Sequence, residues 1–294
     1  MKDTLTTPDA IAADIVRVTN LTHAFSKDGG RSQPVLDNVC LSVADGEIVS
    51  LLGRSGSGKS TLLRIIAGLL KPTKGEVMLD GKPVTGPAAG VAMVFQTFAL
   101  MPWLTVLENV EFGLEAQGVP RDERRKRALA AIDLIGLDGF ESAYPKELSG
   151  GMRQRVGFAR ALVMHSKLLL MDEAFSALDV LTAETLRTDL IDLWSEGRLP
   201  IRSILMVTHN IEEAVLMSDR ILLMSSAPGR ITSEIKVDIP QPRRRQDTSF
   251  RALVDDIYAR MTTHGAATIK PGVFPGTGIG MALPRVSSNA LSGL

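Results

Sequence analysis

Several features that define common protein classes are scarce or missing in this sequence of 294 residues. Cys40 is its only cysteine, which excludes disulfides within the chain and cysteine-rich metal sites, and fits a reducing compartment such as the cytosol. Its surroundings, Val39-Cys40-Leu41, are typical of a buried strand. No apolar run reaches the roughly 18 residues that a membrane-spanning helix needs, and the start, MKDTLTTPDA, is unlike a signal peptide. If the protein serves a membrane, we expect another chain to cross it.

An excess of charge of either sign is also missing. Lysine and arginine together number 33, aspartate and glutamate together number 33, and the formal net charge at pH 7 is zero. A protein that binds nucleic acid usually carries a basic excess, because it must neutralise phosphates. The balance therefore argues against a nucleic-acid partner.

What is present, in the first part of the chain, is a series of short strand patterns. Val39, Leu41 and Val43 alternate before an Asp-Gly pair, and residues 76–79 precede a second Asp-Gly pair. Both patterns indicate antiparallel strands joined by tight turns. Between them lies EIVSLLG, an apolar run typical of a buried strand, and the apolar spacing over residues 59–70 predicts a helix after it.

The pattern then changes twice. Residues 97–166 show helical spacing and few strand signals, whereas alternating strands and helices return after them. We therefore expect an α/β core interrupted by a helical insertion. At the ends we expect an N-terminal tail over residues 1–13, a linker with one amphipathic helix over residues 241–264, and a tail rich in glycine, proline and serine over residues 265–294.

A glycine-rich loop follows the buried strand. GRSGSGKST, residues 53–61, fits the pattern G-x-x-x-x-G-K-S and lies between a strand and a helix, the context that a phosphate-binding loop requires. Its glycines let backbone N–H groups converge on phosphate oxygens. Lys59 would reach the β- and γ-phosphates, and Ser60 would ligate Mg²⁺. The alternative is a glycine turn with a chance lysine, which the flanking strand and helix disfavour.

A second apolar strand ends in two carboxylates. KLLLMDE, residues 167–173, finishes with Asp172 and Glu173. Asp172 suits a Mg²⁺ contact through water, and Glu173 would then orient or deprotonate an attacking water. Alone, the pattern fits equally well a strand that ends in a solvated acidic turn. The glycine-rich loop favours the functional interpretation, because phosphoryl transfer needs a carboxylate on the metal side from a neighbouring strand.

Two further polar residues follow apolar strands. Gln96 ends the predicted strand VAMVF, and His209 ends the predicted strand SILMV. Singly, each is more often a strand-end residue with a structural hydrogen bond. Both nevertheless fall at the carboxyl ends of strands, where open α/β sheets bind their ligands. Of the four histidines, His209 is the catalytic candidate, because His23, His165 and His264 have no comparable setting.

The segment LSGGMRQRVGFAR, residues 148–160, is a second place that could hold an anion. Judged alone, it is typical of a serine-capped helix whose apolar face packs on a core. Its arginines, Arg153, Arg155 and Arg160, would then form a solvated face. On these residues alone, the capped helix is the favoured interpretation.

Taken together and in this order, the motifs resemble those of the ATPase subunit of ABC transporters. The resemblance rests on the glycine-rich loop, Gln96, LSGGMRQ, LLLMDE, SALD and VTH, and it covers residues 14–240. It implies a P-loop NTPase fold of the ABC type, an α/β core with an antiparallel β flank and a helical subdomain, at about residues 97–166, inserted between the two Walker motifs. It also implies ATP hydrolysis with ATP and Mg²⁺ as cofactors.

The resemblance assigns roles residue by residue. It implies catalytic roles for Glu173, His209, Gln96 and Lys59. It implies Mg²⁺ binding by Ser60, Gln96 and, through water, Asp172. The residues that would bind ATP in the chain's own site are Phe25, Gly53, Ser55, Gly56, Gly58, Lys59, Ser60 and Thr61. Phe25 would stack on adenine, at a position where the family more commonly has tyrosine.

A second subunit would complete the site. ATPases of this family work as head-to-tail dimers, so Ser149, Gly150 and Gly151 would contact the ATP held by the partner, and Asp179 would also take part in nucleotide binding. The partner would be a second copy of this chain or a close paralogue. Such a dimer would explain why one chain carries two places for an anion.

A finer resemblance concerns the transport system. FQTFALMPWLTVLENVEFGL and VTHNIEEAVLMSDRILLMSSAPGRI look like the importer group for nitrate, sulfonates such as taurine, and bicarbonate. The implied partners are transmembrane permease subunits and, indirectly, a periplasmic or lipid-anchored solute-binding protein. The chain would lie peripherally on the cytoplasmic face of the inner or plasma membrane. A groove for the permease would form around Phe98, Leu100, Met101, Pro102 and Trp103; alternatively, Trp103 packs inside the helical insertion.

Other interpretations stay open at this point. An exporter or lipid-transport ATPase of the same fold would share the whole catalytic set. A soluble, non-transport ABC ATPase would lead us to expect two cassettes, a zinc-bearing or coiled-coil insertion or a basic surface, and the sequence has none of these. A P-loop kinase would leave LSGG and His209 unexplained. The C-terminal tail departs from the minimal family pattern and looks like either the linker to a missing domain or a disordered tail.

Overall fold

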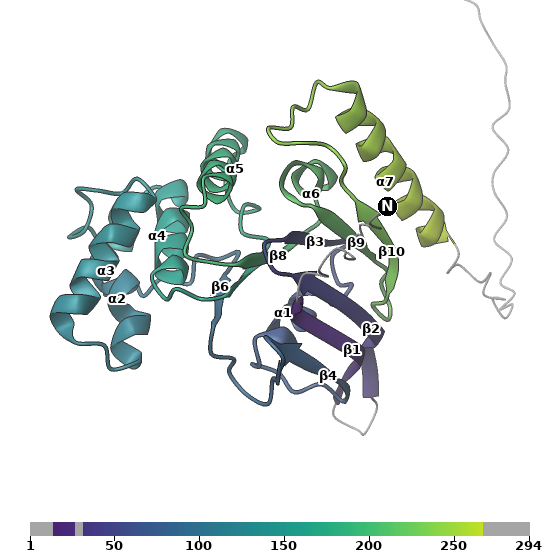
Figure 1. The fold of residues 1–294 in the computed structure, drawn as a ribbon, viewed down its shortest axis with the longest axis horizontal. Coiled ribbons are helices and arrows are strands. Elements are labelled where there is room, and N and C mark those ends of the chain that lie inside the picture. The colour runs from purple at the N-terminus through teal and green to yellow at the C-terminus, as the bar shows by residue number, and fades with distance from the viewer. Residues whose placement is uncertain (1–13, 27–31, 267–294) are drawn as a thin grey trace, which may run out of the picture.

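The computed structural model describes residues 14–26 and 32–266, which form two β-sheets covered by helices (Figure 1). The expected N-terminal tail over residues 1–13 lies outside the described residues, as do residues 267–294 of the expected C-terminal tail. None of the helices in the described part of the chain is both long enough and apolar enough to cross a membrane.

The first sheet is antiparallel, with the strand order β2-β1-β4-β5. Its strands are β1 (Asp14–Ser26), β2 (Ser32–Ala44), β4 (Lys74–Leu79) and β5 (Lys82–Pro83). The alternation along β2 buries Val39, Leu41 and Val43, as the period of two predicts. The expectation that Cys40 is buried was wrong, because the same alternation exposes it. Its thiol donates a hydrogen bond to Asn20 Oδ1 at 3.3 Å.

The second sheet has six strands in the order β10-β9-β3-β8-β7-β6. These are β3 (Ile48–Gly53), β6 (Val91–Val94), β7 (Leu168–Asp172), β8 (Ser203–Thr208), β9 (Arg220–Met224) and β10 (Ile231–Lys236). All neighbouring pairs are parallel except β10 with β9 at one edge. Every residue of β3 and β8 is buried, which explains why both strands are mainly apolar. The polar residues after β3, β6, β7 and β8 therefore meet at one edge of the sheet.

Helices occupy the chain between β6 and β7. They are α2 (Val106–Ala116), α3 (Arg121–Leu134), the short 3₁₀ helix η1 (Pro145–Glu147) and α4 (Gly150–Leu162). Figure 1 shows α2, α3 and α4 at one end of the molecule, beyond β6. A capping box starts α2, since Thr105 N–H donates to Glu108 Oε2 at 2.8 Å while Thr105 Oγ1 accepts from Glu108 N–H. The expected α/β fold with an antiparallel flank and inserted helices is confirmed.

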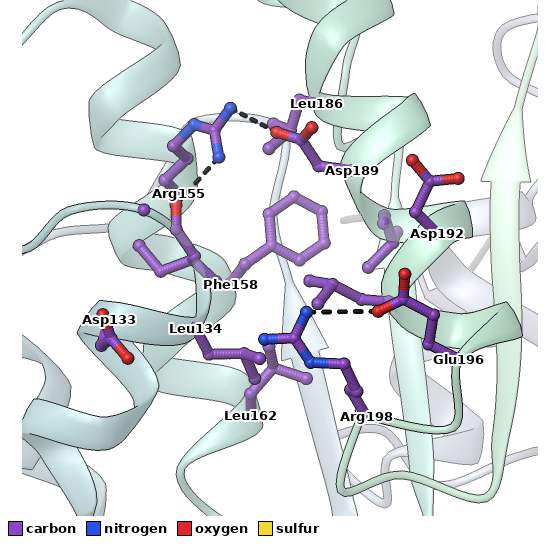
Figure 2. Close-up of a pocket in the computed structure, with 14 residues that line it drawn as sticks. Asp133, Leu134, Arg155, Phe158, Leu162, Leu186, Asp189, Asp192, Glu196 and Arg198 are labelled. Atoms are coloured by element: carbon purple, nitrogen blue, oxygen red, sulfur yellow. Dashed lines mark hydrogen bonds and ion pairs between the residues drawn. The ribbon is translucent and has the colours of Figure 1, made fainter.

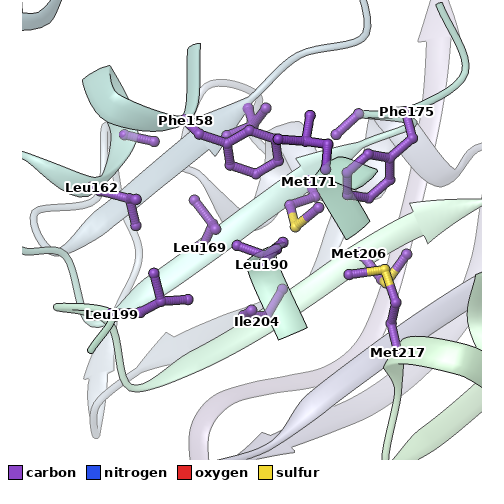
Figure 3. Close-up of a cluster of buried hydrophobic side chains, with 14 of the residues drawn as sticks. Phe158, Leu162, Leu169, Met171, Phe175, Leu190, Leu199, Ile204, Met206 and Met217 are labelled. Atoms are coloured by element: carbon purple, nitrogen blue, oxygen red, sulfur yellow. The ribbon is translucent and has the colours of Figure 1, made fainter. Parts of the chain in front are cut away.

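The six-stranded sheet separates two apolar cores. On β7, Leu168 and Leu170 join the core that contains α1 (Lys59–Ile66) and the antiparallel sheet. Leu169 and Met171, which point to the other face, join the core beneath the remaining helices. Figure 3 shows this second core, in which Phe158 of α4 lies near the strand residues. The inserted helices therefore pack directly on the sheet that carries the predicted site.

The other helices are α5 (Val180–Ser195), α6 (Ile211–Met217) and α7 (Thr248–Ala266). Helix α7 covers the region that the sequence predicts as one amphipathic helix. Its Phe250 and Ile257 are buried, so α7 packs against the second core. Figure 1 shows α7 beside α6, and α6 begins two residues after His209.

Candidate nucleotide-binding and hydrolysis site

The glycine-rich loop joins β3 to α1 at the carboxyl edge of the six-stranded sheet. Gly56 and Gly58 have φ angles of 79° and 94°, which other residues rarely adopt. A Cβ on Gly58 would also lie 2.8 Å from Leu36 Cδ2. Gly58 is the N-cap of α1, and no side chain caps the helix and no acidic residue occupies its first turn. The N–H groups at this helix start are therefore available to an anion.

Lys59 lies inside this loop and is 4% exposed. Its Nζ donates hydrogen bonds to the carbonyls of Gly53 at 2.8 Å and Arg54 at 2.9 Å. Burial lowers the pKa of the ammonium below its usual range, while the charges of Glu173 and Asp172 act in the opposite direction. The loop thus folds around a buried cation next to free N–H groups, and this combination favours phosphate.

Ser60 and Asp172 meet at the edge of the sheet. Ser60 is in the first turn of α1 and Asp172 ends β7, and Ser60 Oγ donates a hydrogen bond to Asp172 Oδ1 at 2.7 Å. Hydroxyl and carboxylate oxygens are ligands that suit Mg²⁺. Among the described residues, no group of three or more histidine, cysteine or acidic side chains could hold a metal. An ion here would therefore take its remaining ligands from phosphate, water and neutral side chains.

Glu173 follows directly and has a left-handed backbone, with φ of 48°. Such a conformation costs a non-glycine residue about 1–3 kcal/mol. It is held by two contacts, because Glu173 N–H donates to Val207 O at 3.0 Å and Ser176 Oγ donates to Glu173 O at 2.8 Å. The side chain faces His209, whose Nδ1 lies 3.2 Å from Glu173 Oε2. The structure therefore brings the two predicted catalytic residues into direct contact.

Gln96 is not the residue that ends strand β6, as the sequence predicted. Strand β6 ends at Val94, so Gln96 lies in an exposed turn beyond the strand rather than at its last residue. Val94 pairs with Met171, which places this turn at the sheet edge that carries Asp172. No hydrogen bond joins the Gln96 side chain to Ser60 or Asp172 within the described residues. Its roles toward metal and phosphate stay predictions.

The segment LSGGMRQ, residues 148–154, contains the start of α4 and is called the signature segment below. Ser149 is the N-cap, and its Oγ accepts a hydrogen bond from Met152 N–H at 3.2 Å. A Cβ on Gly151 would lie 2.3 Å from Thr182 Cγ2 of α5, so glycine permits this close approach of the two helices. In the described part of the chain no hydrogen bond links residues 149–151 to the glycine-rich loop. Figure 1 shows α4 at the outer end of the sheet and α1 near its middle.

The arginines of α4 are not the solvated face that the segment alone suggests. All three are partly buried. Arg155 Nη1 donates to Ile135 O at 2.8 Å, and Arg160 Nη2 donates to Phe98 O at 3.0 Å. The guanidinium of Arg153 lies over the Phe98 ring, 5.5 Å from its centroid. The solvated-face interpretation was wrong, because these side chains hold the segment that follows Gln96 and the end of α3.

Phe25 is 43% exposed near the end of β1. Its ring makes an edge-to-face contact with His23, with 4.8 Å between centroids and an interplanar angle of 86°. His23 pairs with Leu36 on β2, and Leu36 is the residue that Gly58 approaches. An exposed aromatic ring on strands that border the glycine-rich loop suits stacking on a base. The contact with adenine stays a prediction.

Asp179 caps α5, since its Oδ1 accepts a hydrogen bond from Thr182 N–H at 3.0 Å. Hydrogen bonds from Thr182 lower the pKa of the Asp179 carboxyl below its usual range. Its carboxylate therefore has a structural partner within the chain, and its predicted contact with nucleotide is not tested. The loop between Glu173 and Asp179 lines, together with His209, a cavity of about 400 Å³.

A second cavity, of about 320 Å³, lies between the inserted helices and α5 (Figure 2). Its apolar wall includes Phe158. Its arginines already have partners, because Arg155 pairs with Asp189 at 2.5 Å and Arg198 pairs with Glu196 at 3.2 Å. The glycine-rich loop does not contribute to it. This cavity is therefore separate from the nucleotide site, and it shows that α4 is tied to α5.

Two arginines that line the 400 Å³ cavity beside Glu173 and His209 have no counterpart among the predicted site residues. Arg187 and Arg245 both line it. Arg245 belongs to the segment that we expected to be a plain linker, and it pairs with Glu184 and Glu212. No motif spacing could have indicated these pairs, because the partners come from distant parts of the chain. The run of arginines after Pro242 is the sole local signal.

A phosphate-binding loop, a hydroxyl paired with a strand-end carboxylate, and a second carboxylate paired with histidine define a P-loop nucleotide hydrolase. Residues 36–176 match the family model described as ABC transporter. The chain belongs to this family and is an ATP-binding ATPase within it.

The similarity to named relatives supports the same family. The chain is 49% identical over 225 residues to the nitrate import ATP-binding protein NrtD of Synechocystis, with 76% of this chain and 83% of that protein covered. It is 49% identical over 221 residues to the taurine import ATP-binding protein TauB of Burkholderia thailandensis, with 75% and 84% covered. One similar solved structure is a dimeric ATP-binding cassette in a post-hydrolysis state, bound to ADP and Pi. It is 37% identical to this chain with a TM-score of 0.66, and the match covers 76% of this chain and 100% of the cassette.

Proposed function

We propose that this protein is the ATP-hydrolysing subunit of an importer for a small anion of the nitrate, sulfonate or bicarbonate type. The observation that carries the proposal is the meeting of the Ser60–Asp172 and Glu173–His209 pairs at one sheet edge, beside the loop that surrounds Lys59. The solute class is supported by the two named relatives, whose names assign them to nitrate and taurine import.

The residues of the loop bind the triphosphate. Backbone N–H groups of residues 53–61 and the Lys59 ammonium contact the β- and γ-phosphates. Ser60, Gln96 and, through water, Asp172 would hold Mg²⁺, and the oxygen atoms of the Ser60–Asp172 pair suit this ion. When bound, Mg²⁺ neutralises phosphate charge and aligns the leaving group.

In the proposed chemical step, Glu173 acts as the base. A water oxygen attacks the γ-phosphorus while the bond from that phosphorus to the bridging oxygen of ADP breaks, and Glu173 takes a proton from the water. The products are ADP and inorganic phosphate. His209 restrains the Glu173 carboxylate through the 3.2 Å contact of its Nδ1, and its other ring nitrogen is left for the γ-phosphate.

A second chain completes the site. The N-terminus of α4, with Ser149 and the glycines after it, lies apart from the chain's own glycine-rich loop (Figure 1), and the first N–H groups of a helix have no partners within the helix. In a head-to-tail dimer these groups would contact the γ-phosphate held by the partner, so that ATP stabilises the interface and hydrolysis weakens it. The dimeric state of the ADP-bound and Pi-bound cassette supports this arrangement.

The permease would dock next to the turn that carries Gln96. Trp103 is 70% exposed, so the alternative in which it packs inside the inserted helices is wrong. Leu100 packs against the core, and Arg160 and Arg153 hold Phe98 on α4. An exposed ring on a segment that is anchored to the signature helix suits a coupling contact with a helix of the permease. Contact with the permease would keep the chain peripheral on the cytoplasmic face of the inner or plasma membrane, opposite the solute-binding protein.

Uptake into vesicles tests the proposal. The chain is co-expressed with the permease and solute-binding protein that we expect the neighbouring genes to encode, and the complex is reconstituted with ATP inside the vesicles. We expect ATP-dependent uptake of labelled nitrate, taurine or bicarbonate, and no uptake with Glu173→Gln. ATP hydrolysis that never drives uptake of these anions would overturn the solute class, and failure of any multi-span protein to co-purify would overturn the transport role.

A further inference from the structure

Residues 241–247, the last part of the segment between β10 and α7, are anchored to the α/β core instead of forming a free linker. Arg243 is buried, and its Nη1 donates to Val215 O and to Ser218 O, both at 2.7 Å. Gln241 Nε2 donates to Leu216 O at 2.9 Å. These acceptors include carbonyls at the end of α6, which have no partners within the helix. The segment therefore caps the carboxyl end of α6.

Arg245 joins two helices. Its Nη1 and Nη2 donate hydrogen bonds to Glu184 Oε1 and Oε2 of α5, both at 2.7 Å. Its Nε lies 3.0 Å from Glu212 Oε2 of α6. The two-pronged contact with Glu184 fixes the guanidinium in one orientation. The pKa of the Glu184 carboxyl is lowered by the Arg245 guanidinium, so the pair is charged at neutral pH.

Each of the two helices begins shortly after one of the proposed catalytic residues. Helix α5 begins at its cap Asp179, where the loop from Glu173 ends, and α6 begins just after His209. Arg245 lines the same 400 Å³ cavity as Glu173 and His209. The distance between the starts of α5 and α6 determines how the Glu173 loop and His209 face each other.

Arg187 connects this bridge to the catalytic loop. Its Nη2 lies 3.6 Å from Glu184 Oε2 and its Nε lies 3.9 Å from Glu213 Oε1. Its guanidinium also lies 5.8 Å from the centroid of the Phe175 ring, two residues after Glu173. Without Arg245, Arg187 would be the remaining arginine beside the carboxylates of Glu184 and Glu213 among the described residues. Arg187 would then be drawn away from Phe175, and the loop would lose a support.

We propose that Arg245 is a positioning residue for ATP hydrolysis, which sets the Glu173–His209 contact by bridging α5 and α6 from the C-terminal segment. The inference rests on the proposed catalytic roles of Glu173 and His209. Its consequence is that the contacts of Gln241, Arg243 and Arg245 with α5 and α6 support ATP hydrolysis, so that a partner that lifts this segment from α6 slows turnover without blocking ATP binding.

The test compares two neighbouring arginines in the full chain. Arg245→Ala removes the bridge, whereas Arg244→Ala removes the same charge from an exposed side chain with no hydrogen bond or ion pair among the described residues. Glu184→Gln keeps the shape of the glutamate side chain but removes the negative charge that pairs with Arg245. The test therefore does not depend on whether Arg245→Ala folds. Phosphate release is measured over a range of ATP concentrations, at a temperature where circular dichroism shows every variant folded.

For Arg245→Ala and Glu184→Gln we expect kcat to fall by about tenfold or more, with KM for ATP within about twofold, since small displacements of catalytic groups cost up to about a hundredfold in rate. Arg245→Lys should give an intermediate kcat. The variant that combines Arg245→Ala with Glu184→Gln should have a kcat no lower than that of the slower single variant. Equal kcat for Arg245→Ala and Arg244→Ala, or a loss confined to KM, would overturn the inference. Glu173→Gln is assayed in parallel, and its full activity would instead overturn the proposed catalytic role of Glu173.

Discussion

Ser60 Oγ donates a 2.7 Å hydrogen bond to Asp172 Oδ1, although 112 positions separate the two residues in the chain. The contact joins the first turn of α1 to the end of β7, and thus the phosphate-binding loop to the acidic strand end. It is the point at which two separate sequence motifs become one site. The site's chemistry can be tested by changing its members one at a time.

Glu173→Gln keeps the size of the side chain but removes the group that accepts a proton from water. We expect the hydrolysis rate to fall by about a hundredfold or more, with ATP affinity within about twofold of the original. Phosphate release and equilibrium dialysis measure the two quantities. Glu196→Gln, at an exposed position, is the control. A variant that hydrolyses ATP at the original rate would show that Glu173 is not the base.

Lys59→Ala removes the buried cation of the loop. Because hydrogen bonds to charged groups contribute about 1.5–3 kcal/mol, we expect ATP affinity to fall by about tenfold or more in calorimetric titration. Lys71→Ala, which removes an exposed lysine after α1, should leave affinity unchanged. Equal affinities for the two variants would contradict the assignment of the loop.

Gly151→Ala tests the packing of α4 on α5. The added Cβ would lie 2.3 Å from Thr182 Cγ2, so we expect a loss of about 1–3 kcal/mol in the free energy of unfolding. Gly150→Ala, whose Cβ would approach nothing closer than 3.7 Å, is the matched control. Adding Thr182→Ser to Gly151→Ala removes the obstructing methyl group. The double variant should regain much of the lost free energy of unfolding, as measured by urea denaturation. If both alanine variants unfold alike, the two helices do not approach this closely.

The Arg245–Glu184 pair predicts a pH dependence. Arg245 lowers the pKa of Glu184 in the folded protein, so the stability that the pair contributes is complete above the unfolded-state pKa of glutamate, about 4.3. It is lost as the pH falls through the lowered value. The difference in Tm between the original protein and Arg245→Ala should be constant from pH 8 to about 5.5 and should shrink below about pH 4. A difference that grows on acidification would contradict the pairing.

The sequence correctly predicted those parts of the site that depend only on residues close together in the chain. The loop around Lys59 and the strand end at Asp172 need particular residue types at fixed spacing, and the structure forms both in the expected place. Ser149 was also interpreted correctly as a helix cap, because capping depends on three neighbouring residues. Its predicted contact with a partner's nucleotide involves a second chain, so no feature within this chain can establish it.

The predictions that were wrong concern the direction and the distant partners of side chains. Cys40 lies in a strand as expected, but the period of two turns it outward. Arg155 and Arg160 of α4 donate to carbonyls in segments about 20 and 60 positions away, and hydrophobic periodicity carries no information about such contacts. Arg245 was assigned to a linker for the same reason, since its partner Glu184 is 61 positions away.

The central claim is that ATP binds between the glycine-rich loop of one chain and the signature segment of another. Sedimentation with Mg-ATP in a Glu173→Gln background tests it most directly, by comparing Glu173→Gln alone with variants that add Ser149→Arg or Ser149→Asp. The aspartate keeps the helix cap, so its effect is free of capping loss. We predict an ATP-dependent dimer for Glu173→Gln alone, and monomers that still bind ATP with unchanged affinity for both double variants. Loss of ATP binding by these monomers would contradict the claim, because Ser149 would then belong to the site of its own chain.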